Sequence, residues 1–299
     1  MKVTRLPDVE RGAQRAVAVG TFDGVHLGHR EVINGADSVL TFDPHPVSVV
    51  APQHTPKLLT TLERKAELVA ELGVQEMIVI PFDRDFAALR ADEFVEQVLV
   101  GALGARRVSI GENFRFGHRA QGDPALLASD GRFETVVHPL LEVAGEIVSS
   151  SHIRGLLGAG DVTEANRLLG STFQLEGVVA HGDERGRELG YPTANLVPDD
   201  AFVAPGHGVY ACVAQLGPGD RRAAAVSIGV RPTFETGRGE LIEAYVLDFE
   251  GDLYDSTLTL QFLQRLRGER RFESAEALVE QMGRDVAETR EIVERTRRS

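Results

Sequence analysis

The feature that most constrains the fold is a change of pattern near residue 170. Before it, short apolar runs alternate with stretches of helical periodicity. The runs cover residues 16–20, 38–42, 77–81 and 107–110, and the helical stretches start near Thr61 and span about 91–103. Short runs that are apolar throughout are typical of parallel strands buried on both faces. Strands that alternate with helices predict an α/β fold with a doubly wound sheet.

Beyond residue 170, apolar runs follow one another without long helical stretches between them. These runs cover residues 173–180, 208–216, 223–229, 241–249 and 257–262. Gly, Pro and Asp cluster between the runs, as they do in turns. This spacing predicts an antiparallel sandwich or barrel, so that the second part is mainly β.

Two helices are expected around these strands. Asp161 and Glu164 match a capping box and Gly170 is a typical helix stop, so a short helix should end at the change of pattern. A longer helix is expected from about Ser274, and its apolar stripe should pack on the barrel. The stripe consists of Leu278, Met282, Val286 and Val293. We therefore predict two domains, residues 1–170 and residues 171–299.

Charge and composition argue against some classes of partner. The formal net charge is -13, which disfavours nucleic acid and anionic membrane surfaces. No apolar run reaches the ~20 residues of a membrane-spanning helix, and residues 1–14 lack the apolar core of a signal peptide. The one cysteine, Cys212, lies in an apolar run and is expected in the core. These features indicate a cytoplasmic location and predict nothing about oligomeric state.

The sequence GTFDGVHLGH at residues 20–29 follows a predicted strand and opens a predicted helix. Free amides at such a turn bind phosphates in α/β sheets. His26 and His29 are three residues apart and should share a face, with Gly28 between them leaving a ligand unobstructed. Two imidazoles there can donate hydrogen bonds to phosphate oxygens. By itself, the pair is equally consistent with an incidental arrangement or a metal site.

A second polar stretch, SSSHIR at residues 149–154, comes late in the first domain. Its hydroxyls suit a helix cap or a phosphate, and the guanidinium of Arg154 suits phosphate oxygens. Together with His-x-Gly-His, it resembles the motifs of the nucleotidylyltransferase superfamily. The resemblance implies that His26, His29 and Arg154 are catalytic. It also implies an ATP site formed by Gly20, Thr21, Phe22, Gly28, Ser150 and Ser151.

Two further stretches, TFDPHP at residues 41–46 and GENFRFG at 111–117, resemble the N-terminal module of prokaryotic bifunctional riboflavin kinase/FAD synthetases. The resemblance implies that Asn113, Phe114 and Phe116 bind the flavin. Aromatic rings suit contact with an isoalloxazine, and an amide can both donate to its polar edge and accept from it. Without the resemblance, the second stretch is a turn with two core aromatics.

The second domain carries a glycine-rich stretch, GDERGRELGYPTAN, at residues 182–195. Such a loop can close over phosphates, but a plain surface loop has the same composition and no Walker motif is present. Thr193 and Asn195 are two apart on an extended segment, so their side chains point to one side. Their hard oxygen atoms suit Mg²⁺ carried by ATP.

This stretch resembles the riboflavin kinase signature, and blocks at residues 227–234, 243–249 and 266–272 continue the resemblance in family order. It implies that Thr193 and Asn195 are ligands of Mg²⁺-ATP. It also implies further ATP-binding residues at Gly182, Gly186, Arg187 and Gly190.

The resemblance assigns two more roles in the second domain. Glu243 becomes the general base for the riboflavin 5′-hydroxyl, although the strand pattern alone favours an outward polar residue. Arg267 is a candidate for flavin contact. A structural salt bridge between Arg267 and Glu269, or another acid, is an equal alternative.

Taken over residues 16–290, the resemblance predicts a Rossmann-like nucleotidylyltransferase domain, then an antiparallel β-barrel riboflavin kinase domain with a C-terminal helix. It implies two ATP-dependent reactions, riboflavin to FMN and FMN to FAD with release of pyrophosphate. Three alternatives are a riboflavin kinase with an inactive N-terminal domain, a flavin-binding carrier, and a nucleotidylyltransferase for another phosphate ester. One feature departs from the family: only eight residues separate His29 from the strand at Ser38. They allow a helix of about two turns where the family has a longer one.

Overall fold

The protein is described here by a computed structural model that covers residues 1–181, 191–230 and 240–298. These residues form two compact units, Met1–Ser150 and Ser151–Ser299. The helices α7 (Ser150–Ala159) and α8 (Val162–Leu169) cluster with the second unit, apart from the first residue of α7. The functional domain boundary near Gly170 stays a prediction.

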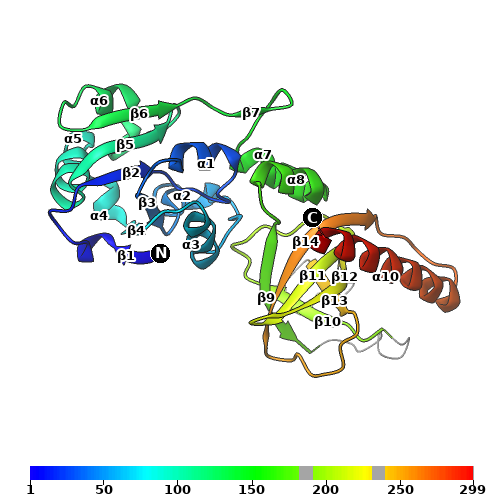
Figure 1. Cartoon of the computed structure of the whole chain (residues 1–299). Coiled ribbons are helices and arrows are strands. Elements are labelled where there is room, and N and C mark those ends of the chain that lie inside the picture. The colour runs from blue at the N-terminus through cyan, green and yellow to red at the C-terminus, as the bar shows by residue number, and fades with distance from the viewer. Residues whose placement is uncertain (182–190, 231–239, 299) are drawn as a thin grey trace. The chain divides into compact units, whose positions relative to one another are not determined.

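A six-stranded sheet forms the centre of the first unit, and all its neighbouring strands are parallel. In spatial order the strands are β1 (Lys2–Arg5), β4 (Glu76–Pro81), β3 (Ser38–Asp43), β2 (Arg15–Val19), β5 (Ala105–Gly111) and β6 (Glu134–His138) (Figure 1). The chain builds outward from β2 in both directions, through β3 and β4 on one side and through β5 and β6 on the other. The predicted doubly wound α/β sheet is therefore confirmed.

Helices cover both faces of this sheet. Successive residues of each strand point to opposite sides, so an apolar strand buries side chains on both faces. Ala18 of β2 packs with Val32 and Leu68 from the helices on one face. Val17 and Val19 pack with the helix on the other face. The main helices are α1 (Leu27–Ile33), α2 (Pro46–Val50), α3 (Leu62–Glu71), α4 (Arg84–Ala87), α5 (Ala91–Glu93), its π-helical continuation η3 (Phe94–Ala102) and α6 (Pro124–Ala128). A short hairpin, β7 (Glu142–Val143) and β8 (Glu146–Ile147), completes the unit.

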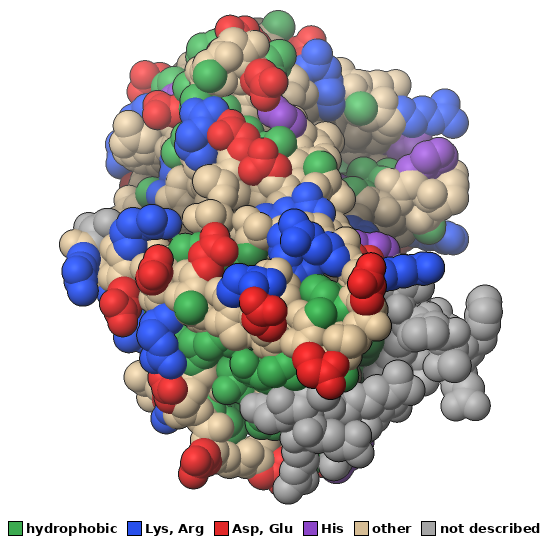
Figure 2. Space-filling view, turned by 90° about the vertical axis from the view of Figure 1, so that its right-hand side faces the viewer, with side chains coloured by type: hydrophobic (Ala, Val, Ile, Leu, Met, Phe, Trp, Pro, Cys, Tyr) green, Lys and Arg blue, Asp and Glu red, His purple; other side chains and the backbone are tan. Residues whose placement is uncertain are grey.

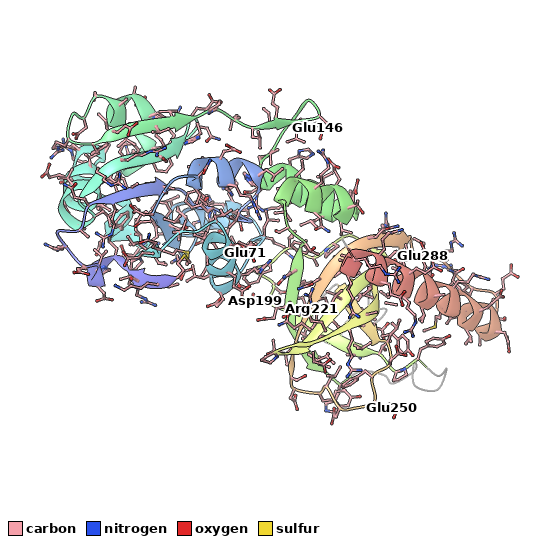
Figure 3. All side chains as sticks on the ribbon, in the orientation of Figure 1. Glu71, Glu146, Asp199, Arg221, Glu250 and Glu288 are labelled. Carbon is pink, nitrogen blue, oxygen red and sulfur yellow. The ribbon has the colours of Figure 1, made fainter. Side chains whose placement is uncertain are left out.

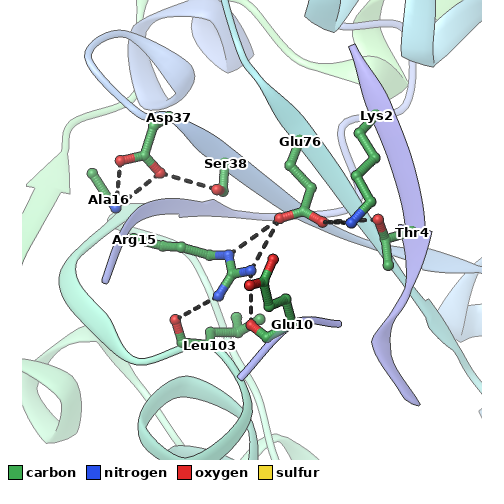
Figure 4. A network of polar contacts seen from close by, with 9 residues as sticks. All are labelled: Lys2, Thr4, Glu10, Arg15, Ala16, Asp37, Ser38, Glu76 and Leu103. Atoms are coloured by element: carbon green, nitrogen blue, oxygen red, sulfur yellow. Dashed lines mark hydrogen bonds and ion pairs between the residues drawn. The ribbon is translucent and has the colours of Figure 1, made fainter. Parts of the chain in front are cut away.

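A polar network holds the amino-terminal edge of the sheet together (Figure 4). Arg15, at the start of β2, places Nη2 3.2 Å from Oε2 of Glu76 at the start of β4. Nη2 also donates to the carbonyl oxygen of Glu10, Nη1 donates to that of Leu103, and Thr4 donates to Glu76. Both charged side chains are largely buried, so loss of Glu76 would leave Arg15 without a carboxylate partner at a cost of about 3–5 kcal/mol, whereas Glu76 is also paired with Lys2. This network lies at the edge opposite to the carboxyl ends of the strands and is structural.

The second unit is built on six antiparallel strands that close into a barrel. In order around the barrel they are β9 (Gln174–Ala180), β10 (Ala194–Pro198), β13 (Glu240–Val246), β12 (Asp220–Val230), β11 (Gly208–Gly217) and β14 (Thr257–Arg267), which pairs again with β9. Alternate residues, such as Ile242 and Ala244 of β13, are buried inside it. The predicted barrel is therefore confirmed.

Two predicted helices flank the barrel. The carboxylate of Asp161 accepts a hydrogen bond from the amide of Glu164 at 3.1 Å and caps α8, and Gly170 ends that helix with a φ of 65°. The long helix α10 (Ala275–Arg298) packs on β11, β12 and β14 (Figure 1). Within the described part of the chain, no helix has both the length and the apolar character needed to cross a membrane.

Acidic and basic side chains are interspersed on the face drawn in Figure 2. Pairs such as Arg284 with Glu280, and Arg132 with Glu96, join exposed side chains. Exposed pairs of this kind contribute little to stability because water and salt screen them. The stability of the fold therefore comes mainly from the apolar side chains buried in each unit.

Candidate active sites

The carboxyl ends of three strands bring the motifs of the first unit to one edge of the sheet. Residues 20–29 follow β2, residues 44–46 follow β3, and residues 112–117 follow β5. β2 and β5 are neighbours, yet the chain leaves them toward opposite sides of the sheet. Such a switch point opens a crevice for a ligand at the carboxyl ends of the strands. The strand order therefore gathers the segments that the sequence analysis singled out.

The turn between β2 and α1 has a strained backbone. Phe22 and Val25 have φ values of 48° and 44°, in the left-handed region that L-residues other than Asn and Asp rarely adopt. Phe22 is nevertheless fixed, since its ring is fully buried in the core beneath α1 and α3. Strained residues persist only where surrounding contacts over-determine them, and they cluster at functional sites.

Contacts from two neighbouring segments hold this turn. Thr41 of β3 donates from Oγ1 to the carbonyl oxygen of Thr21 at 3.0 Å. The amide of Leu59 donates to Oδ1 of the buried Asp23 at 2.8 Å. These bonds come from residues far along the chain, so the shape of the turn depends on the assembled sheet.

The two histidines lie together at the end of the turn. His26 is the N-cap of α1, outside the helix itself, and its Nδ1 accepts a hydrogen bond from the amide of His29 at 3.3 Å. A neutral His26 therefore carries its proton on Nε2 and can donate from there. The His29 ring stacks on His26, with centroids 3.5 Å apart and planes at 16°. Phe22 meets His29 edge-on at 5.4 Å.

Charge on this histidine pair is suppressed. Burial, followed by the nearby His26 and Lys65, lowers the pKa of His29 well below its ordinary value. Because two stacked imidazolium ions would repel each other, the arrangement favours a neutral His29 ring at pH 7. Nδ1 of His29 is buried and has no hydrogen-bond partner within the described structure. The pair is thus organised to donate hydrogen bonds and not to supply two positive charges.

Ser150 connects the second motif to the first. Its Oγ donates to the carbonyl oxygen of Asp23 at 2.9 Å. Ser150 is the last residue of the first unit, whereas Ser151 and Arg154 belong to the second. The approach of Arg154 to the two histidines therefore stays a prediction.

Lys65 is a buried member of this site that the sequence analysis missed. Its Nζ lies 2.8 Å from the carbonyl oxygen of Thr21. A signal was present in the sequence, because Leu62, Ala66 and Val69 define the inner face of α3 and Lys65 falls on the same face. A lysine among the apolar positions of a helix is expected to be buried, and a buried lysine needs a partner.

The predicted flavin segment is partly core. Phe116 is buried, with its ring centroid 5.3 Å from that of Phe94 and 5.6 Å from that of Phe114. Phe114 is half-buried at the margin of the same cluster, and Asn113 is exposed. The description of this segment as a turn with two core aromatics holds for Phe116, whereas Phe114 only packs against the core. Flavin binding by these residues stays a prediction, and Asn113 and Phe114 are the more accessible of the three.

In the second unit, predicted site residues lie in one row across three strands. Strand register places Glu243 of β13 opposite Asn195 of β10 and opposite Ser227 of β12. Residues opposite each other in an antiparallel pair project to the same face. Thr193 Oγ1 lies 3.5 Å from Oε1 of Glu243. The structure therefore brings Thr193, Asn195 and Glu243 together and adds Ser227, to which the sequence analysis gave no role.

This row is on the outer face of the barrel, since Ile242 and Ala244 on either side of Glu243 point inward. Glu243 is thus outward, as the strand pattern alone suggests, yet it is half-buried and Asn195 is buried. A carboxylate, an amide and two hydroxyls in a partly covered position form a set of oxygen atoms suited to a hard cation or a hydroxyl substrate.

Arg267 forms a buried salt bridge with α10. Its Nη2 is 2.7 Å from Oδ2 of Asp285, and Nε is 3.1 Å from both carboxylate oxygens. The side chains are only 12% and 7% exposed. The alternative of a structural salt bridge with another acid is confirmed, and flavin contact by Arg267 stays a prediction.

Four predicted ATP-binding residues, Gly182, Gly186, Arg187 and Gly190, lie outside the described residues. Among the residues that are described, no group of three or more His, Cys, Asp or Glu side chains is arranged to hold a metal ion. The metal-site interpretation of His26 and His29 therefore lacks a third ligand within the described part of the chain.

Comparison with protein families matches the α/β part and the barrel part of the chain to two different families. The family model of FAD synthetase matches residues 9–152, and that of riboflavin kinase matches residues 169–293. A bifunctional riboflavin kinase/FMN adenylyltransferase of Listeria monocytogenes is 38% identical over 92% of this chain and 91% of its own length. An Escherichia coli K12 protein with the same description is 37% identical, over 92% and 91%.

A solved structure extends the likeness to the fold. A Streptococcus pneumoniae protein, described as a macrolide-efflux protein, has a TM-score of 0.86 and 30% sequence identity. The alignment covers 97% of this chain and 99% of that one. Both the order of elements and nearly the full length are therefore shared.

Proposed function

The chain belongs to the family of bifunctional riboflavin kinase/FMN adenylyltransferases, and we propose that it makes FAD from riboflavin in two ATP-dependent steps. The barrel, within residues 171–299, phosphorylates riboflavin to FMN. The α/β domain, within residues 1–170, adenylylates FMN to FAD. The observation that carries this proposal is the presence of two separate polar sites, each in the unit matched by the corresponding family model.

In the kinase reaction, Glu243 is the general base. Its carboxylate accepts the proton of the riboflavin 5′-hydroxyl as that oxygen forms a bond to the γ-phosphorus of ATP. The bond between the γ-phosphorus and the bridging oxygen breaks, and ADP leaves. The register of β13 with β10 and β12 supports this role, because it fixes the backbone of Glu243 between Asn195 and Ser227.

Thr193 and Asn195 would hold Mg²⁺ together with the ATP phosphates. The fit is supported by the donor set, since the Thr193 hydroxyl lies beside the Glu243 carboxylate, Asn195 is paired opposite Glu243, and Mg²⁺ prefers hard oxygen ligands. When bound, the ion neutralises charge on the phosphates during transfer. The glycine-rich segment with Gly182, Gly186, Arg187 and Gly190 is proposed to cover these phosphates.

In the adenylylation reaction, a phosphate oxygen of FMN forms a bond to the α-phosphorus of a second ATP, and pyrophosphate leaves. His26 and His29 donate hydrogen bonds to oxygens on which negative charge develops, and Arg154 adds a cationic fork. No covalent intermediate with the protein is needed. The ATP is received by the segments around Gly20, Thr21, Phe22, Gly28, Ser150 and Ser151. The flavin lies against Asn113 and Phe114, with Phe116 as a further candidate for flavin contact, whereas Arg267 is a candidate for flavin contact in the barrel.

The length of α1 bears on this second reaction. The helix has seven residues, the two turns expected from the short segment after His29, and β2 still pairs with β3 in parallel register. The short connection therefore leaves the strand pairing and the stacked histidines in place. This supports an active α/β domain over a monofunctional riboflavin kinase.

The test of this point supplies FMN, ATP and Mg²⁺ without riboflavin, and separates the products by chromatography. The proposal predicts FAD and pyrophosphate in equal amounts. FMN that stays unchanged, while riboflavin is still phosphorylated in a parallel sample, would instead establish the monofunctional kinase.

A cytoplasmic location is also proposed. It is supported by the single cysteine of the sequence, Cys212, which is buried and free. Proteins of reducing compartments do not depend on disulfides.

A further inference from the structure

Lys65 occupies a position in the first unit where a charged side chain needs an explanation. It is only 8% exposed and its Nζ donates to the carbonyl oxygen of Thr21 at 2.8 Å. The same Nζ is 3.5 Å from Oγ1 of Thr41, which itself donates to the Thr21 carbonyl. A buried ammonium is costly unless it is hydrogen-bonded and paired. An apolar side chain of similar length would fill this space without that cost.

Nearby charges favour the ammonium form. The carboxylates of Asp23 and Asp43 both act to raise the pKa of Lys65, although burial outweighs them and lowers it. Asp23 belongs to the same turn as Thr21, and Asp43 ends the neighbouring strand β3. Lys65 therefore sits at the meeting point of the turn, β3 and α3.

The bond to Thr21 determines which way the turn faces. A carbonyl held by both Lys65 and Thr41 points between β3 and α3, so its negative end is directed into the protein. The proposed ligand of this turn is a triphosphate, and an outward carbonyl would repel it. The following residue, Phe22, has the strained φ of 48°, which the hydrogen bonds on either side help to maintain.

We propose that Lys65 is a positioning residue of adenylyl transfer, and that its ammonium holds the turn from Gly20 to His26 in the shape that receives ATP. This inference rests on the proposed function of the first unit. Lys65 acts through Thr21 and needs no contact with the substrate.

Lys65 also acts on the histidine pair at a distance. Its positive charge is one of the three causes that lower the pKa of His29, after burial and His26. The charged groups that act on the pKa of His29 are thus His26 on the turn and Lys65 on α3. The carboxylates of Asp23 and Asp43 act in turn on the pKa of Lys65. Removing the charge of Lys65 should therefore let the His29 pKa rise. A neutral side chain that only filled this space would have no such effect.

The test compares Lys65→Met, Lys65→Gln and Thr41→Val. Met keeps the length and removes both charge and donor, whereas Gln keeps an N–H donor for Thr21. We expect Lys65→Met to lower kcat for FAD formation by at least about 10-fold, since small displacements of positioned groups are costly. The KM for ATP should change less, and Lys65→Gln should recover part of the rate. Thr41→Val keeps the ammonium and should lose less than Lys65→Met.

FMN formation by the barrel in the same molecules is the internal control and should not change. Titration of the histidine ring signals by NMR, with ¹³C-labelled histidine and no substrate, is the second readout. The His29 midpoint should rise in both Lys65 variants and stay in place in Thr41→Val. If Lys65→Met does not fold in the first unit, Lys65→Gln provides both measurements.

Two results would overturn the inference. One is a Lys65 variant with the wild-type kcat for FAD formation. The other is a Gln variant as inactive as Met, with the His29 midpoint unmoved, which would reduce Lys65 to a packing role. Failure of the proposed function itself looks different, because then the wild-type chain would form no FAD from FMN while the titration could still respond to Lys65.

Discussion

The hydroxyl of Ser150 donates a hydrogen bond of 2.9 Å to the carbonyl oxygen of Asp23, across 127 positions of sequence. This bond joins the start of α7 to the turn that carries His26 and His29. Ser150, the last residue of the first unit, therefore ties the start of the second motif to the turn that carries the first. The proposed adenylylation depends on that turn and its histidines, and the proposed phosphorylation depends on Glu243 in the barrel.

Replacement of His29 by Ala should impair adenylylation alone. The variant loses one donor to the developing charge and the ring on which His26 stacks, so FAD formation from FMN should fall by about 10²-fold. Phosphorylation of riboflavin should stay at the wild-type rate, because His29 lies in the other unit. Separate assays for pyrophosphate and ADP measure the two effects. Equal losses in both reactions would contradict the division of labour.

Replacement of Glu243 by Gln should have the opposite effect. Gln keeps the size and the polar contacts of the side chain but removes the base, so FMN formation should fall by about 10²–10⁴-fold. FAD formation from supplied FMN should be unaffected. Glu250→Gln is the matched control, since Glu250 is exposed at the surface of the same unit (Figure 3). An active Glu243→Gln would remove the carboxylate from the mechanism.

The stability of the first unit should fall in mild acid, in part because of His29. Its pKa in the folded protein is well below the value of about 6.5 in an unfolded chain. As pH falls below the unfolded-state pKa of about 6.5, the unfolded state takes up a proton that the folded state does not, so the free energy of unfolding decreases. Thermal unfolding at pH 7.5 and pH 5.5 should show a smaller acid-induced loss of Tm for His29→Gln than for wild type. A larger loss in the variant would reverse the assigned direction of the shift.

Cys212 should be unreactive in the folded protein. Burial raises the pKa of its thiol well above the ordinary value, so almost no thiolate exists at pH 8, and thiolate is the reactive form. A chromogenic disulfide reagent should detect no thiol at pH 8 in native protein and one per chain after unfolding. Rapid labelling of the native protein would show that the barrel core opens easily.

The sequence predicted the buried strands better than the edge strands. β2, β3, β4 and β5 are covered on both faces and are therefore apolar throughout, which made them recognisable. β1 and β6 are edge strands that carry Lys2, Arg5, Glu134 and His138, and their polar residues concealed them. β10 was also missed as a strand, because it is short and ends at Pro198. Its pairing with β9 and β13 is decided by the closed barrel and not by its own pattern.

The candidate sites were predicted at the level of residue type, and their contacts were not. Residue type and spacing drew attention to His26 and His29, and the family resemblance added Glu243, which the strand pattern alone did not single out. The bonds of Lys65 to Thr21 and of Ser150 to Asp23 depend on which strands become neighbours, and no local pattern encodes that order. The pattern of α3 places Lys65 on the apolar face of the helix, but it does not show that Thr21 and Thr41 are its partners.

The central claim is that one chain holds two independent transferase sites, and a mixing experiment tests it most directly. Riboflavin, ATP and Mg²⁺ are given to His29→Ala, to Glu243→Gln, and to an equal mixture of the two, and the flavins are separated by chromatography. The account predicts that His29→Ala accumulates FMN, that Glu243→Gln leaves riboflavin unchanged, and that the mixture makes FAD. A mixture that makes no FAD, or a Glu243→Gln protein that makes it from riboflavin unaided, would contradict the account.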